Sequence, residues 1–328
     1  MYKKIFTILI IALSISAFSA FAYAVDDEVG ATFAKTHEYL TANKASITTT
    51  PTEGFQNGYL LVKGEGLPFA GSKSEAQKRL TACRAAKIIA DRNLVEITNG
   101  VAIAGETTVE NSELASDKIR AAVSGMIKGD QVVSEEYNSQ EGSCLVLVKL
   151  GMNGPGSLGE AMYKNLGVGK GADKVDPTVA SVVPQPTGPV FNPAAKTADK
   201  AEKAEYIAAK KEVAAEGYDG LIIDATAQTF RPALINRIYS PNGEVIYDPS
   251  KISQKILVEQ GCGEYTNSID KAKAALGARD VKNPLVVTAA QAVGNTDLQV
   301  SAKDGVEIFA ANQKSPFLAS AKVAFVLK

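Results

Sequence analysis

Hydrophobic and polar positions follow two different periods along the chain, and the first region where both occur spans residues 59–150. Residues 59–63 form a short apolar run that predicts a strand. In residues 74–98 the apolar positions recur at helical spacing, which predicts a long helix, and Asn99-Gly100 is typical of its end. The positions expected on its buried face are Leu80, Cys83, Ala86, Ala90, Leu94 and Ile97.

Further elements complete this first unit. The turn-forming residues at 138–142 indicate that the two strands around them form a hairpin. The second of these strands is apolar at nearly every position, which is typical of a strand covered on both faces. The predicted elements are extended segments at 101–104 and 107–109, a second helix at 114–127, and strands at 131–137 and 143–150.

A second unit begins near residue 218 and again mixes strands with helices. Its clearest signal is the turn at Pro241-Asn-Gly243, because Asn-Gly readily adopts the positive φ angles of tight hairpins. The interleaved pattern predicts an α+β class, with two modules whose helices pack on mixed or antiparallel sheets. The expected strands lie at 218–224, 234–239, 244–247, 284–292, 297–300 and 321–327, and the expected helices at 267–277 and 301–309.

The segments around the two units differ in composition. Residues 25–58 predict an N-terminal helix at 29–43 and a linker. Residues 151–195 are rich in glycine and then in proline, which is typical of a linker. Residues 196–216 predict a spacer helix, so the C-terminal part spans 196–328. A flexible linker would let the units move independently, which argues against a fixed cleft between them.

The first 24 residues have the features of a signal peptide. A basic start, Met1-Tyr-Lys-Lys4, precedes an apolar run at 5–21 and the small residues of Ala22-Tyr-Ala24. We expect cleavage before Val25 and a periplasmic or secreted protein, with outer-membrane association as an alternative. An uncleaved anchor is the other interpretation, since the apolar run is nearly long enough to span a bilayer. The first cysteine is Cys83, so the cleavage point lacks the cysteine that a lipoprotein needs.

Composition narrows the classes of partner and site. A charged fraction of 22% and a net charge of -1 argue against nucleic acid and anionic membranes as partners. The three cysteines have no zinc-site spacing and His37 is the single histidine, so we predict no metal site. A disulfide between Cys83 and Cys144 is one interpretation in an oxidising compartment. Both residues lie on apolar faces, however, which favours buried free thiols.

Residues 66–74, GLPFAGSKS, stand between a predicted strand and a predicted helix, where a phosphate-binding loop would lie. They depart from the pattern G-x-x-x-x-G-K-[ST] because Ser72 precedes the lysine, and one extra residue rotates that lysine by about 100° on a helix. Ser72-x-x-Glu75 and Ser74-x-x-Gln77 are instead capping-box patterns. The loop therefore predicts a helix start, and we expect no nucleotide partner.

Carboxylate side chains are the remaining candidates for catalytic residues. Asp224 ends a buried strand and is followed by Thr226 and Arg231, which is compatible with a carboxylate-dependent enzyme. The interpretation we favour is an ion pair between Asp224 and Arg231 that closes the sheet edge. Glu135-Glu136 is expected to protect an edge strand from aberrant pairing, and His37 to be a solvated surface residue. We predict no catalytic, cofactor-binding or metal-binding residue.

The first unit carries a series of motifs in a fixed order. They are ACRAAKIIADRNLVEI at 82–97, Gly100-Val101, Thr107-Thr-Val109, Ser116-Asp-Lys-Ile-Arg120, Ser124-Gly125 and Val132-Val-Ser-Glu-Glu-Tyr137. This order resembles the bacterial twenty-kilodalton lipoprotein family, and it is similar to the N-terminal domain of flagellar assembly protein T, a periplasmic component around the flagellar motor. The resemblance covers residues 59–150, and the second half looks like a region joined to such domains in exported proteins.

These features predict an exported, non-enzymatic protein of a bacterial cell envelope that acts as a binding or assembly module. The resemblance implies protein partners in the envelope, among flagellar or outer-membrane components, and self-association is a further alternative. It carries over no catalytic residue and no cofactor. The other interpretations are an enzyme centred on Asp224 and a periplasmic small-ligand binder.

Overall fold

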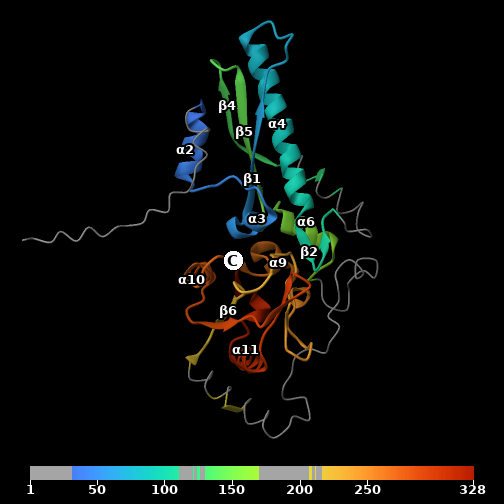
Figure 1. The fold of residues 1–328 in the computed structure, drawn as a ribbon, viewed down its shortest axis with the longest axis vertical. Coiled ribbons are helices and arrows are strands. Elements are labelled where there is room, and N and C mark those ends of the chain that lie inside the picture. Colours follow the sequence, from blue (N-terminus) through green and yellow to red (C-terminus); the bar gives the residue numbers. More distant parts are fainter. Residues whose placement is uncertain are drawn as a thin grey trace, which may run out of the picture.

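The computed structural model describes residues 32–110, 130–169 and 216–328, with single positions between them at 121, 124, 125, 207, 208 and 211. The predicted signal peptide lies outside the described residues, as do nearly all of the predicted helix at 114–127 and of the spacer helix, and the linker beyond residue 169. Helices pack on parallel and antiparallel sheets, so the protein has the predicted α+β fold (Figure 1).

The first unit is built on a three-stranded antiparallel sheet with the order β1-β5-β4. The strands are β1 (Tyr59–Gly66), β4 (Gln131–Asn138) and β5 (Ser143–Gly151), and β4 and β5 form the predicted hairpin. The long helix α4 (Glu75–Asn99) covers one face. It lies very close to β1, because a Cβ atom at Gly64 or Gly66 would overlap the backbone of α4.

The other face of this sheet is covered by α2 (Ala34–Ala42), whose Leu40 packs with Leu61 and Leu147. The carboxylate of Glu136 on β4 accepts hydrogen bonds from the backbone amides of Lys35 (3.3 Å) and Thr36 (3.0 Å) at the start of this helix. Glu136 thus has a specific partner in the fold, which the general role of an edge-strand charge did not anticipate. The free amides of a helix start are satisfied from another element.

Three of the described helices were not predicted from the sequence, and two of these are very short. α3 (Pro51–Asn57) lies in the expected N-terminal linker and begins with a capping box formed by Thr50 and Glu53. α9 (Gln254–Gln260) lies in the second unit. Both helices have only seven residues, too short for apolar periodicity to show them.

The expected linker at 151–195 is wrong for its first part. Residues 151–169 continue the fold, and α6 (Leu158–Asn165) packs against α9 with Met162 and Tyr163 fully buried. Glycines with positive φ, such as Gly154 and Gly167, make the tight turns on either side of this helix. The glycine content therefore indicates turns around a short core helix, not a flexible chain.

The second unit contains a parallel four-stranded sheet with the order β10-β6-β13-β9. α10 (Ile269–Gly277) packs on one face through Ala272 and Leu276, and α11 (Ala302–Lys314) joins the core on the other face through Ile308. The strands are β6 (Gly220–Asp224), β9 (Glu264–Thr266), β10 (Pro284–Thr288) and β13 (Val323–Val326).

Shorter elements surround this sheet. A second sheet has the order β11-β12-β7-β8, in which β7 and β8 form the predicted hairpin, shorter than expected. Its strands are β7 (Ile238–Tyr239), β8 (Val245–Tyr247), β11 (Gln291–Val293) and β12 (Asp297–Gln299). The remaining elements are the hairpin of β2 (Ala102–Ala104) and β3 (Thr107–Thr108) and the 3-10 helices Pro249–Lys251 and Leu318–Ser320.

The two units share one hydrophobic core. Backbone amides of Leu234 and Ile235 donate to the carbonyls of Ala102 (3.0 Å) and Ile103 (2.9 Å), so β2 is hydrogen-bonded to the second unit. The rings of Phe55 and Tyr265 also meet across the junction, at 5.2 Å between centroids. The expectation of a flexible separator is therefore wrong for residues 151–169, because Met152, Met162 and Tyr163 belong to this shared core.

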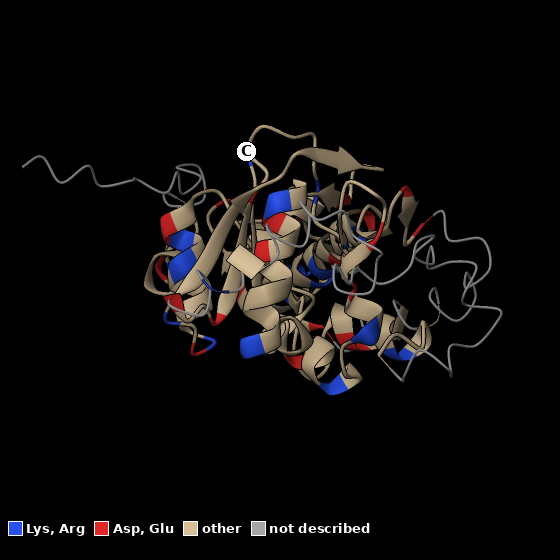
Figure 2. Ribbon diagram, turned by 90° about the horizontal axis from the view of Figure 1, so that it is seen from below, with Lys and Arg blue, Asp and Glu red and all other residues tan. Residues whose placement is uncertain are grey.

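The surface carries both signs of charge. Basic and acidic residues are interspersed along the helices (Figure 2), in line with the net charge of -1. Among the residues that the structure describes, no helix is both long and apolar enough to cross a bilayer.

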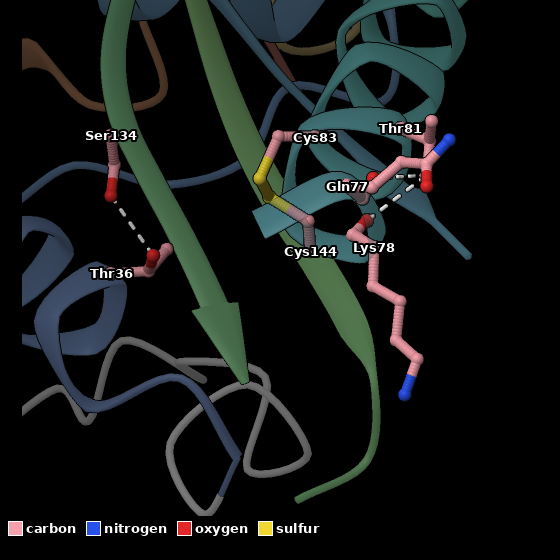
Figure 3. Close-up of a disulfide and its surroundings, with 7 residues drawn as sticks. All are labelled: Thr36, Gln77, Lys78, Thr81, Cys83, Ser134 and Cys144. Atoms are coloured by element: carbon pink, nitrogen blue, oxygen red, sulfur yellow. Dashed lines mark hydrogen bonds between the residues drawn. A yellow bond between two sulfur atoms is a disulfide. The ribbon is translucent and has the colours of Figure 1, made fainter. Parts of the chain in front are cut away.

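Cys83 and Cys144 form a disulfide that joins α4 to β5, with 5.0 Å between their Cα atoms (Figure 3). The preference for two free thiols is therefore wrong, and Cys262 is the buried free cysteine. Both paired residues do lie on apolar faces, as expected, but those faces pack directly against each other. Sequence periodicity identified the two faces without showing that they meet.

Removing the disulfide is expected to lower the free energy of unfolding by about 2 to 4 kcal/mol, because the bond closes a loop of 61 residues in the unfolded chain. Urea denaturation of the Cys83→Ala/Cys144→Ala variant, compared with the wild type with and without dithiothreitol, measures this. Cys262→Ala is the control and should keep the sensitivity to reductant. A wild type that reductant leaves unchanged would contradict the prediction.

Candidate interaction surface

The structure does not bring Asp224 and Arg231 together. The carboxylate of Asp224 accepts hydrogen bonds from the backbone amide (3.0 Å) and hydroxyl (2.7 Å) of Thr226, which stabilises the turn after β6. Arg231 donates to the carbonyl of Gly105 (3.1 Å) and pairs with Glu106 (3.6 Å) in the β2–β3 turn. The expected Asp224–Arg231 pair is therefore wrong, and Arg231 stabilises the junction of the units instead.

The carboxyl edge of the parallel sheet is closed by groups of the same chain. Open α/β sheets bind their ligands at this edge. Here the carbonyl of Asp224 accepts from the amide of Ala289 (2.9 Å), and the carbonyl of Thr266 accepts from the amide of Leu327 (2.7 Å). The side chain of Gln228 donates to the carbonyl of Ala289 (3.1 Å). This edge is filled by turns and gives Asp224 no open site.

The glycine loop is a helix start, as predicted. The hydroxyl of Ser74 accepts from the amide of Gln77 (3.2 Å), and the Gln77 side chain accepts from the amide of Lys73 (2.8 Å). The amide of Phe69 donates to the hydroxyl of Thr81 (3.1 Å), which folds the loop back onto α4. The amides of Phe69, Ser72 and Lys73 in this loop are thus bonded within the protein. His37 is partly exposed on α2.

The loop presents large apolar side chains to solvent. Leu67 and Phe69 are each 68% exposed, and Leu80 in the second turn of α4 is 70% exposed. We call these three residues the tip patch. They lie where α4 begins, at the end of the first unit that is farthest from the second unit (Figure 1).

Leu80 was expected on the buried face of the helix, and this expectation is wrong. Gly66, the last residue of β1, lies opposite Ala82 and Ala86 and pairs with Cys144 on β5. The turns of α4 before Ala82 therefore extend beyond the sheet. An apolar residue there has the correct helical spacing but no strand beneath it.

A groove of about 890 Å³ continues from the tip patch along the flank of α4. α4 contacts mainly β1 and β5, which leaves a hollow between the helix and the edge strand β4. Ile88, at 52% exposure, is the largest apolar side chain in it besides Leu80. We call it the α4 groove, and its lining residues are Ala76, Arg79, Leu80, Cys83, Arg84, Lys87, Ile88 and Glu135.

The charges of the α4 groove are predominantly basic. Lys87 is held by Asp91 and by both carboxylate oxygens of Asp130 (2.9 and 3.0 Å). Partial burial opposes its charge, but these hydrogen bonds outweigh burial and raise the pKa of Lys87. Arg79 and Arg84 form no ion pair within the described part of the chain. Glu135 is the only acidic residue among the lining residues.

The second unit holds a buried charged cluster that the sequence reading missed. The Arg237 side chain is 1% exposed, and its Nε lies 3.3 Å from a carboxylate oxygen of Asp248. Asp297 accepts from the backbone amide of Arg237 (2.8 Å), and burial raises the pKa of Asp297 to about 6. Burial and the neighbouring Asp297 raise the pKa of Tyr239 to about 12. An arginine inside a predicted strand was the available signal, since such a residue needs a buried partner.

This cluster is a structural feature of the sheet β11-β12-β7-β8. Among the residues that the structure describes, no group of three or more His, Cys, Asp or Glu side chains is arranged to hold a metal ion. Asp248 also accepts from the backbone amide of Ser250 (3.0 Å) and so caps a short 3-10 helix. The cluster holds Arg237 in place between two carboxylates.

A comparison with known protein families gives a match to the second unit. A family model described as the second domain of Treponema pallidum Tp0624 matches residues 220–328. The matched range begins at β6 and includes the whole parallel sheet, which is about one third of the chain. No curated protein matches the chain. The chain therefore has a second unit similar to that domain.

Asp297→Asn is expected to change the dependence of stability on pH. The folded protein keeps the Asp297 proton up to about pH 6, whereas the unfolded chain releases it near the ordinary value of 3.8. Native stability from this group is thus lost as the pH rises between these values, by up to about 3 kcal/mol. Asparagine keeps an oxygen that accepts from the backbone amide of Arg237, but it has no proton to release, so this pH-dependent loss of stability disappears.

Urea denaturation between pH 4 and pH 7.5 measures this effect. The variant should gain stability over the wild type as the pH rises, whereas Asp270→Asn, an exposed control on α10, should follow the wild-type curve. An Asp297→Asn curve parallel to that of the wild type over this range would contradict the assignment.

Proposed function

We propose that this chain is a non-enzymatic binding or assembly module of a bacterial cell envelope, and that the tip patch and the α4 groove are its binding surface. The observation that carries the proposal is the exposure of Leu67, Phe69 and Leu80 on an ordered loop and helix. Large apolar side chains that are exposed in this way cost free energy in water, and groups of them mark interaction sites in soluble proteins.

The rigidity of the first unit favours this role. The loop is tied to α4 through Thr81, and α4 is joined to β5 by the disulfide close by (Figure 3). An apolar surface that is already ordered loses little conformational entropy when it binds a partner. Such preorganisation is characteristic of binding modules.

The disulfide also bears on the compartment. Disulfides form and persist in oxidising compartments such as the bacterial periplasm. The Cys83–Cys144 bond therefore agrees with export through the signal peptide predicted at residues 1–24. The resemblance of the first unit to the lipoprotein family and to flagellar assembly protein T stays a prediction, and it suggests flagellar or outer-membrane proteins as partners.

The alternatives have less support. Asp224 is engaged by Thr226 at a filled sheet edge, so an enzyme centred on it has no open site there. The charged cluster around Arg237 is also buried and paired within the fold, so it is closed to solvent.

A small-ligand binder would require a cleft with convergent polar groups. A pocket of about 580 Å³ is lined by polar residues such as Asn153 and Lys322. Its Arg279, however, is already bonded to Glu264 and to the carbonyls of Gln260 and Ala321. The exposed apolar surface of the first unit fits a protein partner better.

Site-specific crosslinking in cells tests the proposal. With a photo-reactive residue at position 78, next to the tip patch, we expect one envelope protein to be captured reproducibly. Leu67→Ser/Phe69→Ser should reduce this capture about tenfold, because central apolar contacts dominate binding energy. The control Val286→Ser removes an exposed apolar side chain of the second unit, 41% exposed, and should leave capture unchanged.

Two results would contradict the proposal. If Leu67→Ser/Phe69→Ser captures the same protein as well as the wild type and the Val286→Ser control do, the tip patch is not the binding surface. If the wild type captures nothing above background at position 78 but does so at position 286, the second unit carries the binding function. Circular dichroism and thermal unfolding confirm that each variant is folded before the comparison.

A further inference from the structure

We propose that the α4 groove binds an amphipathic helix whose apolar stripe is flanked by acidic side chains. This inference rests on the proposed function and names the chemistry of the partner. Leu80 and Ile88 would contact the apolar stripe, and Arg79 and Arg84 would pair with the acidic residues. The structure supports this partner class by shape and by charge.

The shape of the α4 groove suits a helix. Its lining residues on α4 run from Ala76 to Ile88, a length of about 18 Å at 1.5 Å per residue. This corresponds to about three turns of a partner helix. Small residues line part of the floor, Ala76 and the disulfide-bonded Cys83, so a partner can approach closely there. Helices commonly bind in such grooves through apolar residues at three- and four-residue spacing.

The charge of the α4 groove selects an acidic partner. Lys87 is neutralised by Asp91 and Asp130, whereas Arg79 and Arg84 form no ion pair within the described residues. Arg84 is four residues from both Leu80 and Ile88 and stands in one row with them, whereas Arg79 lies beside that row, about 100° around the helix axis from Leu80. Acidic residues beside the apolar stripe of a partner helix can therefore meet both arginines. A basic helix would be repelled.

Purified protein of residues 25–328 with its disulfide intact permits a direct test. The probe is a fluorescein-labelled synthetic helix of about 18 residues with a leucine stripe flanked by glutamates, and its matched control carries lysines at the same positions. Fluorescence anisotropy should show binding of the glutamate probe at least about tenfold tighter than of the lysine probe. Binding should weaken as salt is raised, because the pairing charges are partly exposed.

Charge-reversal variants test whether the probe binds in the α4 groove. Arg79→Glu/Arg84→Glu should lose the glutamate probe and gain the lysine probe, a reversal that a general loss of folding would not produce. Arg92→Glu is the matched control, since Arg92 is exposed on α4 but does not line the groove, and it should bind as the wild type does. Equal binding of both probes, or the same effect from Arg92→Glu, would overturn the inference.

Three results would show that the α4 groove has another occupant, and each would overturn the inference. The first is a crosslink from a photo-reactive residue at position 88 to residues 111–129 of the same chain. The others are a dimer that Arg84→Glu dissociates, and binding to anionic vesicles without binding of the glutamate probe. If the tip-patch variant loses its envelope partner in cells but the probe does not bind, this inference fails and the proposed function stands. If the tip-patch variant keeps its envelope partner and Arg79→Glu/Arg84→Glu keeps the preference for the glutamate probe, both the proposed function and this inference are refuted.

Discussion

The close contact between α4 and β1 is the constraint on which the rest of the structure depends. Gly64 and Gly66 have no side chains, so the helix lies directly on the strand, and the disulfide then joins it to β5. A helix held over β1 and β5 leaves the edge strand β4 partly uncovered on that face. The α4 groove and the exposed position of Leu80 both follow from this placement.

The end of α4 fixes the second unit. β2 follows the helix immediately and is hydrogen-bonded to residues 234–235, while α6 follows β5 and packs on α9. The parallel sheet therefore faces the first unit with its carboxyl edge already filled by turns and by contacts such as Phe55 with Tyr265. The second unit acts as a rigid base from which the first unit extends (Figure 1).

Charged residues have opposite roles in the two units. Arg237, Asp248 and Asp297 are withdrawn from water and interact with one another inside the fold. Arg237 Nη2 and Asp248 Oδ2 are buried without a hydrogen-bond partner among the described residues, but solvent does not reach them. Arg79 and Arg84 remain in contact with water and free of ion pairs among the described residues, at the border of an apolar surface. Only the second arrangement leaves charge available for recognition of another molecule.

The sequence by itself determined the elements whose signals are local. Ser74 and the apolar period defined α4, turn residues defined the hairpins, and the mixed pattern defined the α+β class. Tertiary structure alone decided whether Leu80 is covered, whether Cys83 meets Cys144 and which group Arg231 pairs with. Periodicity shows which face of an element is apolar, but what lies opposite that face depends on contacts between residues far apart in the chain.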